Sequence, residues 1–131
     1  MTILVAYVPR PEGQAALDKG IEIAKRRNEH LVVINASPGG GKADPSAVDV
    51  QDYERVEKIL NNAGISAELK HYVRGKSAVE EIEELVESLQ ASLLVIGLRK
   101  RSAVGKLILG SVAQELLLSV SCPVLAVKAG V

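Results

Sequence analysis

The sequence contains no phenylalanine and no tryptophan, and only three tyrosines among its 131 residues. Proteins that bind single-stranded nucleic acid stack the bases on aromatic side chains, so this chain lacks the main energetic contribution to that activity. Sixteen basic and sixteen acidic side chains cancel to a formal net charge of zero, so no overall field attracts DNA or an anionic membrane surface. We therefore expect neither nucleic acid nor membrane among its partners.

Cysteine is almost absent, because Cys122 is the one cysteine of the chain. A lone cysteine excludes an internal disulfide and suits a reducing compartment. The sequence has no apolar stretch near the roughly 20 residues that span a bilayer, and no charged and apolar leader of the kind that directs secretion. It therefore predicts a cytoplasmic protein, and its 131 residues predict a single domain over 1–131.

The usual catalytic groupings are missing as well. The two histidines, His30 and His71, have no second His or Cys at the spacing of metal ligands, so we expect no metal site. The nucleophile elbow Gly-x-Ser-x-Gly of hydrolases is absent, and no carboxylate or histidine is identifiable that would position an attacking water. We therefore expect no catalytic residues and no enzyme.

Aliphatic residues are abundant instead, and they alternate between two patterns along the chain. Short apolar runs bounded by Pro or Gly predict five strands, at residues 3–8, 31–36, 65–73, 93–96 and 123–128. Amphipathic segments predict four helices, at residues 12–27, 49–63 and 111–119 and in a segment that Ser77 and Glu80 cap. This alternation predicts a doubly wound α/β domain whose parallel sheet has helices on both faces. Ligands of such sheets bind at the carboxyl ends of the strands, where the winding direction reverses.

The segment 97–111 carries the strongest functional signal. Gly97 follows a buried strand and lets the backbone turn sharply and lie close to a ligand. Gly110 and Ser111 stand at the start of the last helix, where unpaired amides and the helix dipole favour an anion. The cations between these two ends are Arg99, Lys100, Arg101 and Lys106. Such a loop suits a phosphate group, although glycines and capping serines at these places are also common in α/β proteins without a ligand.

The spacing within this segment resembles the nucleotide signature of the universal stress protein family. That signature is a glycine, two residues, a glycine, nine residues, a glycine and then serine or threonine. Gly97, Gly110 and Ser111 match it, and Lys100 stands in place of the second glycine. The resemblance continues, in the family's order, through residues 3–6, the Arg74-Gly75 turn, residues 94–97 and residues 121–127. It covers essentially the whole chain.

The resemblance implies a five-stranded parallel sheet of order 3-2-1-4-5, of the adenine nucleotide alpha hydrolase-like type. Many members of the family bind ATP or another adenine nucleotide, whereas others act through protein partners. The residues that would contact a nucleotide or phosphate, carried over by position, are Gly97, Arg99, Lys100, Gly110, Ser111, Val112, Ala6, Val8, Ala36 and Gly75. Of these, Ala6 and Ala36 would flank the adenine, and Gly75 would let the loop after the third strand approach the nucleotide.

Two departures from the family pattern bear on nucleotide binding. ATP-binding members carry Asp-Gly-Ser at the end of the first strand, where this chain has Val8-Pro9-Arg10. A metal-bridged site thereby loses its hard oxygen ligand. Lys100 is the second departure, since a lysine costs about 1 kcal/mol wherever positive φ is required. Its ammonium would nevertheless neutralise a phosphate as a point charge.

Taken together, these features predict a small cytoplasmic stress-response binding module with a degenerate nucleotide loop and weakened or lost nucleotide affinity. We expect no required cofactor; the expected ligand is ATP or another adenine nucleotide, or a bound phosphate or sulfate. The expected partners are an unidentified protein and a second copy of the chain. The homodimer would form through the exposed edge of the last strand, at Val124, Leu125 and Val127. The alternative is an ATP-binding switch with slow hydrolysis.

Overall fold

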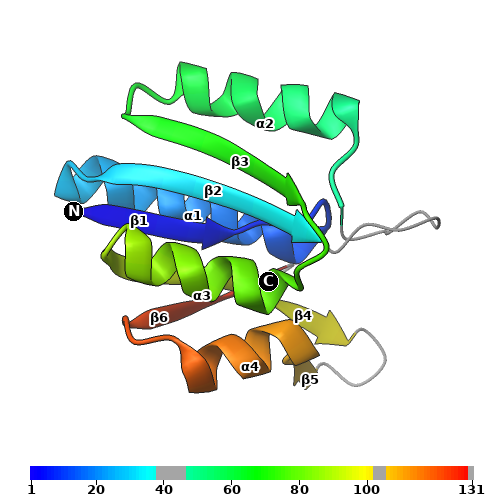
Figure 1. Cartoon of the computed structure of the whole chain (residues 1–131). Coiled ribbons are helices and arrows are strands. Elements are labelled where there is room, and N and C mark those ends of the chain that lie inside the picture. The colour runs from blue at the N-terminus through cyan, green and yellow to red at the C-terminus, as the bar shows by residue number, and fades with distance from the viewer. Residues whose placement is uncertain (38–46, 102–105, 130–131) are drawn as a thin grey trace.

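The computed structural model describes residues 1–37, 47–101 and 106–129 (Figure 1). Along the chain its elements are β1 (Thr2–Ala6), α1 (Pro11–Arg27), β2 (His30–Ser37), α2 (Val50–Asn62), β3 (Ala67–Val73), α3 (Ala78–Ser88), β4 (Ala91–Arg101), β5 (Lys106–Ile108), α4 (Ser111–Ser119) and β6 (Val124–Lys128). All four predicted helices and all five predicted strands are present, and β5 is an addition.

Five parallel strands form the sheet in the order β3-β2-β1-β4-β6, which confirms the doubly wound fold that we expected. β1 lies at the centre, where Ala6 is opposite Ile34 of β2 and Val5 is opposite Val95 of β4. The chain winds outward from β1 through β2 to β3, and then returns to the other side of β1 as β4 and β6. The winding therefore reverses between β1 and β4, the place where doubly wound proteins bind ligands.

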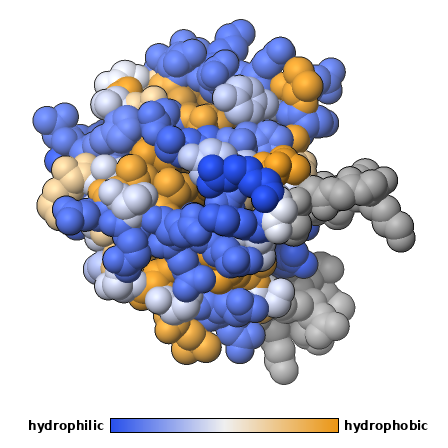
Figure 2. Space-filling model, in the orientation of Figure 1, coloured by the Kyte–Doolittle hydropathy of each residue, from blue (hydrophilic) through white to orange (hydrophobic). Residues whose placement is uncertain are grey.

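Two aliphatic cores form because side chains alternate along each strand. In β1, Ile3 and Val5 pack against α1 and α2 on one face, whereas Leu4 packs against α3 and α4 on the other. All three residues are 0% exposed, and burial of such side chains stabilises a fold by about 1.5–3 kcal/mol each. Figure 1 shows α1 behind the sheet and α3 in front of it. The outer surface in Figure 2 is mostly hydrophilic, with smaller hydrophobic patches between the polar side chains.

A short antiparallel ribbon extends β4 beyond the sheet. We predicted a strand over 93–96 followed by a loop, but β4 continues to Arg101 and pairs with β5, with Lys100 opposite Leu107. The prediction ended the strand at Ile96 because Gly97 suggested a turn and the charged residues 99–101 follow it, so hydrophobicity does not reveal this part of the strand. The backbone at Lys100 is therefore extended, and the positive φ that would strain a lysine does not arise.

The helices that flank the sheet's carboxyl end begin as predicted. Ser77 and Glu80 form the expected capping box, with the backbone N of each residue donating to the side chain of the other at 3.2 Å. This cap holds the first turn of α3, which carries Ala78 and Ile82 to the ends of the strands. Ser111 begins α4 at the predicted residue. None of the helices in the described part of the chain is both long and apolar enough to cross a membrane.

Candidate functional site

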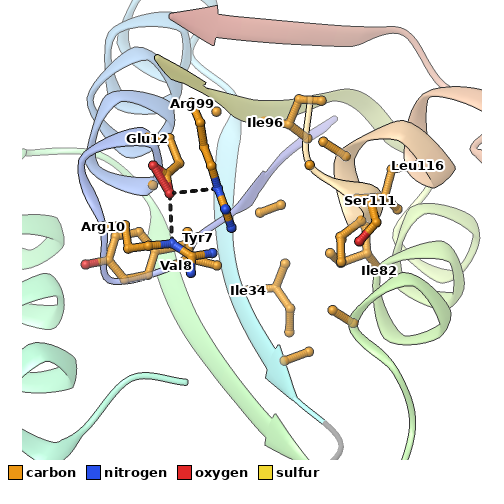
Figure 3. A pocket seen from close by; sticks show the side chains of 18 residues that line it. Tyr7, Val8, Arg10, Glu12, Ile34, Ile82, Ile96, Arg99, Ser111 and Leu116 are labelled. Atoms are coloured by element: carbon orange, nitrogen blue, oxygen red, sulfur yellow. Dashed lines mark ion pairs between the residues drawn. The ribbon is translucent and has the colours of Figure 1, made fainter. Parts of the chain in front are cut away.

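A cavity of about 160 Å³ opens at the carboxyl end of the sheet, where the winding reverses (Figure 3). The ends of β1, β2 and β4 form its base, and the first turns of α1, α3 and α4 form its sides. Eight of the ten residues that the sequence predicted for nucleotide or phosphate contact line this cavity: Ala6, Val8, Ala36, Gly97, Arg99, Gly110, Ser111 and Val112. The fold thus gathers in one place residues that are far apart in the sequence.

The other two predicted residues are placed differently. Gly75 lies in the turn between β3 and α3 and is not among the residues that line the cavity. Its φ of 77° explains why glycine suits this position, because side chains disfavour the left-handed region. The side chain of Lys100 lies outside the described part of the chain, so a contact between its ammonium and a phosphate stays a prediction.

The floor of the cavity is aliphatic. Ile34, Ile82, Ile96 and Leu116 come from four different elements and point toward one another there (Figure 3). The sequence did not single out these residues for binding, because each reads as an ordinary core position, and each is at most 3% exposed. An apolar floor with polar groups at its margin is typical of small-molecule sites. It suits the flat, weakly polar part of a ligand.

One side of the cavity is a cationic wall, formed by Arg10, Glu12 and Arg99 (Figure 3). Glu12 Oε1 lies 2.8 Å from Arg10 Nε and 3.6 Å from Arg99 Nε. The Glu12 side chain is only 11% exposed, whereas that of Arg99 is 50% exposed. Two guanidiniums and one carboxylate leave the wall with one net positive charge, which favours an anionic ligand group.

Sequence reasoning missed Arg10 and Glu12 as parts of this wall. The carboxylate absent at Val8 is present nearby as Glu12, in the first turn of α1. Acidic residues are common in first turns because they favour the helix dipole, so Glu12 alone gives no functional signal. Its pairing with Arg99 depends on the packing of α1 against β4, which the sequence pattern does not reveal.

Glycines bring that wall together. A Cβ at Gly97 would collide with the backbone carbonyl of Glu12, and a Cβ at Gly13 would collide with the backbone of Val8. The first turn of α1 therefore fits closely between β4 and the loop after β1 only because both positions lack a side chain. We expected Gly97 to let the backbone turn sharply and lie close to a ligand. The turn was wrong, because β4 runs straight through Gly97 to Arg101. Gly97 still lines the cavity, and its missing side chain makes room for Glu12.

The opposite side of the cavity is the N-terminus of α4. Gly110 occupies the N-cap with φ −64° and ψ 161°, and no side chain among the described residues caps this helix. An added Cβ at Gly110 would meet nothing within 4 Å. The first-turn amides thus remain available to an anion beside the Ser111 hydroxyl, and the helix dipole adds to their attraction.

The loop that carries Val8 and Arg10 is fixed by polar contacts behind it, which are buried or part-buried. The Tyr7 hydroxyl donates to Asp52 Oδ2 at 2.8 Å and accepts from Arg55 Nη2 at 2.8 Å. Burial, together with the neighbouring Asp52 carboxylate, raises the pKa of Tyr7 far above its ordinary value. The Asn35 side chain donates to the Tyr7 carbonyl at 2.9 Å. Tyr7 therefore ties β1 to α2 as a neutral phenol.

Comparisons with known proteins agree with this architecture. The model of the universal stress protein family matches residues 1–128. A universal stress protein from Mycolicibacterium smegmatis is 47% identical over 126 residues, which are 96% of this chain and 96% of that protein. Two solved structures of universal stress proteins from Archaeoglobus fulgidus cover 98% of each chain: one at TM-score 0.81 and 32% identity, and one in complex with dAMP at TM-score 0.75 and 26% identity. The chain belongs to the universal stress protein family.

Proposed function

We propose that this universal stress protein is a cytoplasmic binding module that takes an adenine nucleotide, or another small phosphorylated ligand, weakly and without a metal ion. One observation carries the proposal: the cavity joins an aliphatic floor to two anion-attracting sides, the cationic wall and the open N-terminus of α4. The base of a nucleotide fits the aliphatic floor, and its phosphate fits between the two anion-attracting sides. The A. fulgidus protein in complex with dAMP supports an adenine nucleotide as the ligand class.

Independence from magnesium follows from the surroundings of Glu12. Mg²⁺ needs oxygen ligands in near-octahedral geometry, and Glu12 is the one carboxylate among the described residues that line the cavity. Its Oε1 atom has guanidinium nitrogens of Arg10 and Arg99 at 2.8 and 3.6 Å. These two cations repel a third, and the Val8 side chain offers no oxygen ligand in compensation. The nucleotide would therefore bind as the free anion, with a modest affinity.

The alternative function, an ATP-binding switch with slow hydrolysis, requires a carboxylate or histidine that orients water or holds a cation. The ion pairs of Glu12 leave it unsuited to either task. The cavity thus favours a binding module over an enzyme.

We also propose that the module is a homodimer through β6. Among the described strands β6 pairs with β4 alone, so its other edge carries unpaired backbone groups. Leu125 is 36% exposed, and Val124 and Val127 are partly buried beside it. An apolar edge of this kind favours pairing with a second strand, and a two-fold axis would satisfy both edges in one closed contact.

Calorimetric titration with AMP and ATP, in magnesium and in EDTA, tests the proposed function. We expect weak binding of both nucleotides with dissociation constants that EDTA leaves unchanged. A submicromolar constant for ATP that collapses in EDTA would overturn the metal-free site. If neither AMP nor ATP binds, an adenine nucleotide is not the ligand and the proposed ligand class is wrong.

A further inference from the structure

The contacts within the cationic wall are incomplete. Arg10 Nε and Glu12 Oε1 approach to 2.8 Å without the alignment of a hydrogen bond, and both are buried atoms that lack a hydrogen-bond partner among the described residues. The second contact, between Arg99 Nε and Glu12 Oε1, is 3.6 Å long, which is beyond hydrogen-bond distance. Buried polar atoms without partners are rare and costly. The wall therefore retains donor capacity that Glu12 does not satisfy.

We propose that Glu12 is an internal anion that competes with the ligand's anionic group for Arg10 and Arg99. This inference rests on the proposed function and makes Glu12 a determinant of affinity for charged ligands. Arg99 is the mobile partner, because half of its side chain is exposed and its contact with Glu12 is long. On binding, its guanidinium turns from Glu12 to a phosphate or carboxylate group in the cavity, where bidentate contacts are stronger.

Charge determines the direction of the effect. With Glu12 ionised the wall carries one net positive charge, and with a neutral glutamine of the same shape it would carry two. The substitution Glu12→Gln also removes a negative charge next to the incoming phosphate, so anion affinity should rise by roughly tenfold at the effective dielectric of a half-solvated site. A purely structural role predicts the opposite sign, because glutamine would loosen the arginines and lower the affinity.

The test is calorimetric titration with AMP and with adenosine, in EDTA and at one ionic strength. Adenosine lacks the phosphate and reports only on the floor of the cavity. The matched control is Glu22→Gln, which removes the same charge from an exposed part of the same helix, where Glu22 pairs with Lys19 at 2.8 Å. We expect Glu12→Gln to bind AMP roughly tenfold more tightly than the native chain and Glu22→Gln to match the native chain, with adenosine unchanged in both.

A second variant keeps the proposal testable if Glu12→Gln does not fold, which circular dichroism would reveal. Arg99→Gln should weaken the affinity for AMP by about tenfold and leave the affinity for adenosine unchanged. An equal or weaker AMP affinity in Glu12→Gln, or a parallel gain for adenosine, would overturn the internal-anion role while leaving the proposed function intact. Failure of both the native chain and Glu12→Gln to bind AMP would overturn the proposed function and this inference with it.

Discussion

The substitution Gly97→Ala separates the structural role of the first signature glycine from a role in ligand contact. A methyl group at residue 97 would lie 2.9 Å from Glu12 Cβ, and closer still to the Glu12 carbonyl. Carbon atoms in contact prefer about 3.5–4.0 Å. Backbone cannot move aside by changing rotamer, so the first turn of α1 would have to shift away from β4.

The shift of this turn determines how much the substitution lowers the free energy of unfolding. Overpacking costs about 1–3 kcal/mol when side chains and backbone must adjust. We expect the upper end, about 3 kcal/mol, because the obstructing atoms belong to the main chain. For a domain of this size such a loss lowers Tm by roughly 10 °C. The assay is urea denaturation at pH 7, which gives the free energy of unfolding, with a thermal melt beside it.

Gly110→Ala is the matched control, since it changes the other signature glycine. A methyl group there meets none of the described residues within 4 Å, and the φ of −64° suits alanine. Only the N-cap preference for glycine over alanine is lost, about 0.5–1 kcal/mol, which is well below the loss expected for Gly97→Ala. If Gly97→Ala were as stable as the native chain, or if both variants lost the same stability, the close packing of Glu12 on Gly97 would not be what requires glycine at residue 97.

The remaining predictions concern stability, metal dependence and assembly. Tyr7→Phe should cost about 1 kcal/mol in urea denaturation, because the part-buried Asp52 carboxylate loses the hydrogen bond that the phenol donates; an unchanged midpoint would show that this hydrogen bond does not stabilise the fold. The Arg74 guanidinium holds the pKa of Glu81 below its usual range, so this carboxylate stabilises the fold above about pH 4.3 and loses that contribution as pH falls through its lowered pKa. In the Glu81→Gln variant the free energy of unfolding should therefore fall less between pH 5 and pH 3 than in the native chain. An unaltered pH dependence would contradict the stabilising role of the Glu81 carboxylate. The substitution Val8→Asp supplies the missing oxygen ligand and should strengthen ATP binding in magnesium but not in EDTA, as measured by titration; equal binding in both media would contradict this role of residue 8. In light scattering the native protein should have the mass of two chains, and the Leu125→Pro variant should have the mass of one chain. A mass of one chain for the native protein would refute the dimer.

The sequence patterns predicted the fold well because the aliphatic runs are buried on both faces of a sheet. The predicted strand 31–36 lies within His30–Ser37, for example, and the capping pair of Ser77 and Glu80 begins α3 as expected. The strand Lys106–Ile108 escaped prediction because its pairing with β4 is a backbone contact that the side-chain pattern does not encode.

The candidate site was predicted only in part. Gly97, Gly110 and Ser111 could be chosen because a spacing connects them within one segment of the chain. Glu12 could not, since its importance depends on contact with Arg99, and an acidic residue in a first turn is ordinary. Long-range packing is the information that a local pattern lacks.

A crystal structure of the protein grown with AMP in the absence of metal would show directly whether the cavity is the nucleotide site. We expect the base over Ile34, Ile82 and Ile96, with the phosphate held between Arg99 and the first-turn amides of α4. A nucleotide bound elsewhere on the surface, or a cavity that stays empty at saturating AMP, would contradict this expectation.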